Sequence, residues 1–276
     1  MKKYRKWIQI GLLLGIVLFL TACGNTNEAV SAESTGFWDR YVIYNLSQFI
    51  VWLSNLMGGS YALGIIVFTI IVRLLLLPLN NMQTKSQRKM MEIQPELDAI
   101  KEKYPNQDKA SMEAMQQEQQ ALLDERGVNQ FAGCLPLAIQ LPVMMALYQS
   151  ILRTDVLREG TFLWTNLGEM DPYFILPILA ALLTFANSYL TMKSNPTQNT
   201  TSKMMIYVMP IMILIISLGL PSAITLYWVV SNAFTVVQTL IFNNPYKIIA
   251  EREAKAQAEK DRQRELKKAL KRAKRR

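Results

Sequence analysis

The residues between Ser60 and Asn80 are the feature that most constrains the fold of this chain. They read SYALGIIVFTIIVRLLLLPLN, an almost unbroken apolar run with a single charge, Arg73. About 20 apolar residues at 1.5 Å each span the roughly 30 Å hydrocarbon core of a bilayer, so the run predicts a transmembrane helix over 60–80. An arginine in such a helix costs roughly 2.5–3.5 kcal/mol to insert, and its side chain therefore needs water, an anion or a partner.

Two environments for Arg73 are compatible with the sequence. The residue lies about 6 positions, or roughly 9 Å, from the end of the apolar run, so its long side chain could snorkel toward the membrane surface. Alternatively, the guanidinium faces a polar, water-filled cavity inside a helix bundle. We favour the cavity because a guanidinium remains charged at physiological pH and cannot adapt by losing its proton.

The composition indicates an integral membrane protein. Hydrophobic residues make up 51% of the 276 residues, and the sequence has two cysteines and no histidine. This excludes metal sites built on His or Cys clusters and catalysis by Ser-His-Asp or Cys-His groups. The predicted spans contain no Asp or Glu, and no Gly-rich phosphate-binding loop is present, so we expect neither an enzyme nor a bound cofactor or metal.

The N-terminal residues 1–22 predict a lipoprotein signal peptide. Basic residues precede a 13-residue apolar segment, Ile8–Leu20, which is short for a membrane span. The sequence Leu20-Thr21-Ala22-Cys23 resembles a bacterial lipobox, in which Cys23 is lipidated and becomes the mature N-terminus. Acylation would hold residue 23 at the outer leaflet and place the next residues outside the cell. The alternative is an uncleaved anchor helix with an incidental cysteine.

Residues 23–59 predict a polar extracellular tether followed by a helix that lies along the outer membrane surface. Aromatic and leucine side chains recur at spacings of three and four between residues 36 and 58, with polar residues between them. This pattern is typical of an interfacial amphipathic helix. The alternative is a further membrane span, which the polar residues disfavour. Gly58-Gly59 is expected to end this helix.

The remaining sequence predicts an all-α membrane protein with five transmembrane helices in the mature chain. After the span at 60–80, helical runs at 83–103 and 107–126 predict a cytoplasmic helical hairpin within 81–130. The further spans are expected at 131–152, 173–192, 204–220 and 223–242. They are separated by an extracellular loop at 153–172 and a cytoplasmic loop at 193–203, and a basic cytoplasmic tail follows at 243–276.

The distribution of basic residues supports this topology. The three segments expected in the cytoplasm carry 22 Lys and Arg residues, whereas the outer segments carry only Arg40, Arg153 and Arg158. Cytoplasmic loops of membrane proteins have an excess of Lys and Arg. The sequence thus predicts a multi-pass protein of the bacterial cell membrane, with its lipid-anchored N-terminus outside and its C-terminus in the cytoplasm.

Taken together, these features resemble the YidC-type membrane-protein insertases, in the short Gram-positive form that lacks a large periplasmic domain. The resemblance extends from the lipobox to the basic tail. It rests on the Arg73 helix and on four short motifs, Leu77-Pro78-Leu79, Gln94-Pro95-Glu96-Leu97, Gly133-Cys134-Leu135-Pro136 and Leu226-Tyr227-Trp228-Val229-Val230-Ser231-Asn232. It implies a protein that inserts nascent membrane proteins, here called clients, into the membrane and helps them fold.

The resemblance also implies a site and partners. Arg73 would lie in a hydrophilic groove that opens to the cytoplasm and to lipid but not to the outside, with Gln140, Asn187 and Trp228 as candidates for its other walls. The basic tail would bind the ribosome, with inner-leaflet lipids as an alternative ligand. Insertion would proceed alone or with the Sec translocon. A competing hypothesis is a small anion transporter or channel with Arg73 as its binding site, but the chain shows no internal repeat.

We predict that Cys23→Ala abolishes lipid attachment, because the acyl chains require that thiol. The measurement is incorporation of radiolabelled palmitate in growing cells, with Cys134→Ala as the matched control that should keep the label. Labelling of the Cys23→Ala protein at the native level would rule out the lipobox.

Overall fold

The computed structural model describes residues 29–106, 108–128, 135–193 and 200–273. These residues are almost entirely helical, and the two strands in them have two residues each. The predicted all-α class is therefore confirmed. The signal peptide, Cys23 and the Gly133-Cys134 part of the third motif lie outside the described residues.

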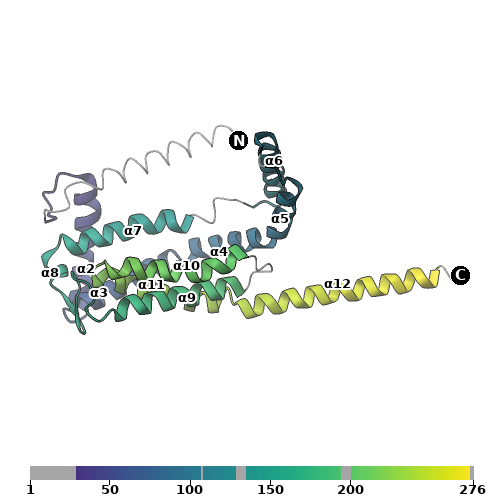
Figure 1. The fold of residues 1–276 in the computed structure, drawn as a ribbon. Coiled ribbons are helices and arrows are strands. Elements are labelled where there is room, and N and C mark those ends of the chain that lie inside the picture. Colours follow the sequence, from purple (N-terminus) through teal and green to yellow (C-terminus); the bar gives the residue numbers. More distant parts are fainter. Residues whose placement is uncertain (1–28, 107, 129–134, 194–199, 274–276) are drawn as a thin grey trace.

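Five helices form the central bundle: α3 (Tyr61–Leu75), α7 (Leu135–Leu152), α9 (Ile175–Lys193), α10 (Thr200–Leu218) and α11 (Ser222–Phe242). α11 packs against α3, α7 and α9, and α10 packs against α9 (Figure 1). The core of the bundle is apolar, with fully or almost fully buried side chains at Ile65, Leu147, Ile151 and Ile224.

The apolar helices differ in length. Among the described residues, α9 and the helical run that begins at Ser222 are long and apolar enough to cross a membrane. A third candidate is the bent pair formed by the helical segment Trp38–Leu56 and α3, if the two are counted as one span. Ala138–Leu152 and Ile206–Leu218 are shorter apolar helices. The structure thus shows an apolar helical bundle whose helices differ in length.

A sharp bend separates α3 from the preceding helix. A π-helical segment η1 (Trp38–Ile43) continues into α2 (Tyr44–Leu56), and the axis then turns by 113° into α3. Gly58 and Gly59 occupy the turn with φ of 73° and 86°, a backbone region that favours glycine. A Cβ at Gly64 would overlap the Ser54 hydroxyl, so a residue without a side chain lets α2 and α3 pack closely.

Two helix breaks differ from the sequence prediction. The helix predicted over 60–80 ends at Leu75, and α4 (Leu77–Glu92) begins directly after it with Pro78 in its first turn. The run predicted over 83–103 is divided at Ile93, where α5 (Gln94–Lys103) starts with Pro95 in its first turn. Proline lacks an N–H and clashes with the carbonyl four residues earlier, so each proline begins a helix instead of continuing one.

The helices α5 and α6 (Lys109–Glu125) pack against each other through a small apolar cluster of Ile93, Leu97, Leu123 and Val128. Asp108 accepts a hydrogen bond from the Ser111 N–H and caps α6. Hydrogen bonds from Lys103 and Tyr104 lower the pKa of the Glu118 carboxyl below its ordinary value and tie the two helices together. Leu97 of α5 and Leu123 of α6 therefore belong to one apolar cluster.

The two ends of the bundle are different. The segment predicted as a loop at 153–172 contains α8 (Asp155–Arg158) and an antiparallel pair of strands, β1 (Thr161–Phe162) and β2 (Thr165–Asn166). The opposite end carries α5, α6 and the long helix α12 (Pro245–Ala273), which extends far from the bundle (Figure 1). The chain thus places its structured short loop at one end and its charged helices at the other.

A partly buried ion pair fixes the start of η1 to the bundle. Arg153, at the end of α7, donates to both carboxylate oxygens of Asp39 over 3.0 and 2.8 Å. The Arg153 side chain is only 5% exposed. Sequence reasoning assigned Arg153 no role beyond its place in the count of outer basic residues. The pair joins residues 114 positions apart and holds η1 against α7.

We predict that Asp39→Ala lowers the stability of the protein by about 3 kcal/mol, because it takes the carboxylate from a buried guanidinium. The measurement is thermal unfolding in detergent. Asp155→Ala is the control, since its ion pair with Arg158 is exposed and is expected to contribute less than about 1 kcal/mol. Equal stability of both variants would contradict a structural role for the buried pair.

Candidate functional site

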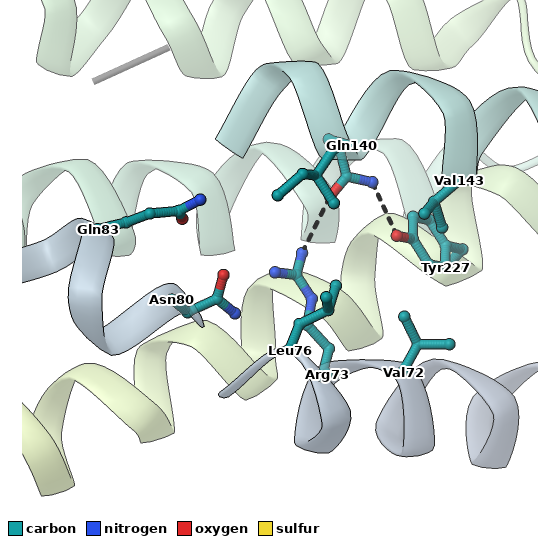
Figure 2. Close-up of a pocket in the computed structure, with 9 residues that line it drawn as sticks. Val72, Arg73, Leu76, Asn80, Gln83, Gln140, Val143 and Tyr227 are labelled. Carbon is teal, nitrogen blue, oxygen red and sulfur yellow. Dashed lines mark hydrogen bonds between the residues drawn. The ribbon is translucent and has the colours of Figure 1, made fainter. Parts of the chain in front are cut away.

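Arg73 lies in the last turn of α3 and points toward α11 and α7. Its Nε donates to the Ser231 hydroxyl oxygen at 2.7 Å, and a terminal nitrogen donates to the same oxygen. The terminal nitrogen also lies 3.5 Å from the side-chain oxygen of Gln140 (Figure 2). Ser231 is buried, with 1% of its surface exposed. The guanidinium is therefore held between two helices.

Tyr227 orients Gln140. The Gln140 side-chain nitrogen donates to the Tyr227 hydroxyl oxygen at 2.7 Å, which leaves the Gln140 oxygen facing Arg73 (Figure 2). Tyr227 and Ser231 are four residues apart on α11, so they project from the same face of that helix. One face of α11 thus contacts Arg73 directly through Ser231 and indirectly through Gln140.

The charge of Arg73 has no carboxylate partner in the described part of the chain. The ion pairs formed there involve other residues, and the hydrogen-bond acceptors around the guanidinium are a hydroxyl and an amide. Neutral acceptors satisfy N–H groups without cancelling the positive charge. A partly buried, uncompensated cation attracts an anion more strongly than a surface cation does, because the dielectric constant around it is lower.

Two neighbouring cavities lie beside the guanidinium, and Arg73, Asn80 and Gln83 line both of them. The first is enclosed by α3, α4, α7 and α11, and Figure 2 shows Asn80 and Gln83 extending from α4 toward Arg73. The second, of about 160 Å³, continues between α4 and the C-terminal half of α11. Neither lining contains an acidic residue.

The bundle is apolar on the other side of Arg73. The residues of α3 before Arg73, including the buried Ile65 and Phe68, pack against Leu147 and Ile224. The polar residues that line the larger cavity lie at or after Arg73 in α3 and α4 and in the second half of α11 or directly after it. The polar region therefore lies toward the end that carries α5, α6 and α12, and the tightly packed core separates it from the end that carries α8.

The structure brings together two of the four residues predicted for the groove. Arg73 and Gln140 are in contact. Asn187 instead donates to the side-chain oxygen of Asn232 at 3.1 Å, and Trp228 packs against the apolar core while its carbonyl accepts from Asn232. Neither residue lines the two cavities.

Sequence reasoning did not assign roles to Ser231, Tyr227, Asn80 or Gln83. A signal for the first two was present, because polar side chains recur at three- and four-residue spacing on α11, at Tyr227, Ser231, Thr235 and Gln238. Such a polar stripe on an apolar helix indicates a face turned toward water or a polar partner. Asn80 and Gln83 lie in a polar segment, where the sequence has no comparable contrast.

Comparisons with known proteins identify the family of this chain. A family model described as 60Kd inner membrane protein matches residues 52–251. Membrane protein insertase YidC of Enterococcus faecalis is 50% identical over 98% of this chain and 96% of its own length. The chain belongs to the YidC family. Membrane protein insertase MisCA of Bacillus subtilis is also similar, with 44% identity over 86% of this chain and 92% of that protein.

A solved structure supports the fold. An active YidC insertase crystal structure with the first transmembrane domain resolved matches 75% of this chain with a TM-score of 0.58 and 28% identity. The match covers 47% of that longer protein, so this chain spans about half of its length. The resemblance to YidC-type proteins inferred from the motifs is thus confirmed, and the chain is a membrane protein.

We predict that Ser231→Ala lowers stability by about 1.5–3 kcal/mol, the usual contribution of hydrogen bonds to a charged group, because it deprives Arg73 of its closest acceptor. Ser217→Ala is the matched control. Ser217 is equally buried but donates only to a carbonyl of its own helix, so we expect a smaller change. Thermal unfolding in detergent measures both, and an unchanged Ser231→Ala protein would contradict this role.

Proposed function

We propose that this protein is a membrane-protein insertase and chaperone of the bacterial cell membrane, and that Arg73 acts in a hydrophilic groove open to the cytoplasm and to lipid. The observation that carries the proposal is the partly buried guanidinium of Arg73, whose acceptors among the described residues are neutral and which faces polar cavities. The relatives that are named insertases support the general role.

The proposed mechanism uses charge and hydration. Acidic residues in the translocated tail of a client are attracted to Arg73, because Coulomb attraction is strong where the dielectric constant is low. A hydrated cavity that reaches into the bundle shortens the apolar barrier that the polar tail must cross. The apolar helix of the client then moves sideways into lipid, and burial of its apolar surface drives the reaction.

The proposed membrane arrangement has five spans, formed by α3, α7, α9, α10 and α11, with η1 and α2 along the outer surface. α4, α5, α6 and α12 are cytoplasmic, where most of the Lys and Arg residues then lie. α3 has 15 residues and is therefore about 22 Å long, shorter than a typical hydrocarbon core. A short span is accommodated by local thinning of the bilayer, which lowers the barrier further.

We further propose that Cys23 carries the lipid anchor and that nascent clients reach the groove from ribosomes bound by the basic tail, alone or with the Sec translocon. α12 is exposed over most of its length and extends away from the bundle, so its basic residues are available to RNA phosphates or anionic lipids. The hypothesis of a small anion transporter is not favoured, because the close relatives are named insertases.

We predict that Arg73→Ala reduces insertion of a client with an acidic tail by about tenfold or more, whereas Arg73→Lys keeps much of the activity because the cation remains. The measurement is protease protection of the client tail in vesicles that contain equal amounts of each variant. The same client with a neutralised tail is the control, and its insertion should depend less on Arg73. Native insertion of the acidic client by Arg73→Ala would refute the electrostatic mechanism.

A further inference from the structure

Gln83 is a buried polar residue of α4. Gln83 is only 5% exposed, and its side-chain nitrogen has no hydrogen-bond partner among the described residues. Burial of an unsatisfied amide opposes folding, so such a group in a folded protein needs an explanation. Gln83 lines both cavities beside Arg73, and its amide extends from α4 toward the guanidinium (Figure 2).

The chemistry of the larger cavity indicates the kind of ligand. Apart from Arg73, its lining consists of five Asn or Gln side chains and three threonines, with no carboxylate and no lysine. A metal ion would require acidic or other strong ligands, and a phosphate site would normally gather several cations. Amide and hydroxyl groups both donate and accept hydrogen bonds, which matches the alternating N–H and C=O groups of a polypeptide backbone.

We propose that this amide-lined cavity binds the main chain of the client segment in an extended conformation, with the Gln83 nitrogen donating to a main-chain carbonyl. The proposal rests on the insertase function proposed above and adds a second kind of recognition to it. Arg73 selects acidic side chains, whereas Gln83 and its neighbours bind the backbone whatever its sequence.

The physical reason is the cost of unpaired peptide groups in a membrane. A helix satisfies its own N–H and C=O groups, but an extended tail does not, and each group left unpaired in an apolar environment is strongly unfavourable. Side-chain amides that replace water along the path remove part of this penalty. They do so for any tail, because every residue other than proline has the same backbone groups.

Gln83→Met tests the proposal, because methionine has a similar length but no amide. We expect the insertion rate to fall about two- to tenfold, the effect of one neutral hydrogen bond, for both an acidic tail and its neutralised counterpart. The thermal stability of the variant should not fall, since the substitution removes an unsatisfied buried donor. Gln117→Met, on the exposed surface of α6, is the matched control and should insert both clients at the native rate.

A synthetic single-span client provides the test of main-chain recognition. Two amide bonds in its tail are replaced by esters, which lack the N–H and have weaker carbonyl acceptors. The ratio of the insertion rates of the amide and ester clients is measured for the native protein and for Gln83→Met. We expect this ratio to be about two- to tenfold smaller for Gln83→Met, because the variant no longer distinguishes the two carbonyls.

Several results would overturn the proposal. Native insertion rates for Gln83→Met would show that the cavity only holds water, and a loss confined to acidic tails would show that Gln83 binds carboxylates. A photocrosslinker at Gln87, which lines the larger cavity, tests the proposal in a chain that keeps Gln83 and therefore does not depend on whether Gln83→Met folds. Absence of crosslinks between residue 87 and the client tail would also refute the proposal. If the native protein inserts no client at all, the proposed function itself fails.

Discussion

The position of one partly buried cation determines how the rest of this structure is arranged. Arg73 ends an apolar helix and cannot lose its charge, so the protein must surround it with groups that satisfy its N–H bonds. Ser231 and Gln140 do so from α11 and α7, and Tyr227 orients Gln140 in turn. Because these acceptors are neutral, the guanidinium is stabilised and its charge remains available to a ligand.

The rest of the bundle is packed with apolar side chains between Arg73 and the end that carries α8. Apolar side chains fill the space between α3, α7 and α11 before Arg73, and a bend of 113° turns α2 away from the axis of α3. The partly buried Arg153–Asp39 pair holds that region against α7. A cavity that is polar at one end and packed at the other fits the insertase function proposed here, in which a tail enters from one side and a helix leaves into lipid.

The candidate site was only partly predictable from the sequence. Arg73 was identified because a charged side chain is costly within an apolar membrane helix and therefore needs a polar partner or water. Gln140 was identified for a similar reason, and it does contact Arg73. Asn187 and Trp228 are also unusual residues in apolar helices, but they contact Asn232 and the apolar core instead. An unusual residue shows that a partner is needed without showing which partner it has.

The sequence by itself determined the helical membrane fold, the family, the Gly58-Gly59 break and the importance of Arg73, because these depend on local composition, backbone conformation and short motifs. Only the tertiary structure decided which side chains meet Arg73, the burial of Gln83 and the pairing of Asp39 with Arg153. The physical reason is that a nearly uniformly apolar helix carries little information about its rotation around its own axis. That rotation is set by side-chain packing between helices, and it decides whether a polar residue faces the cavity, the core or lipid.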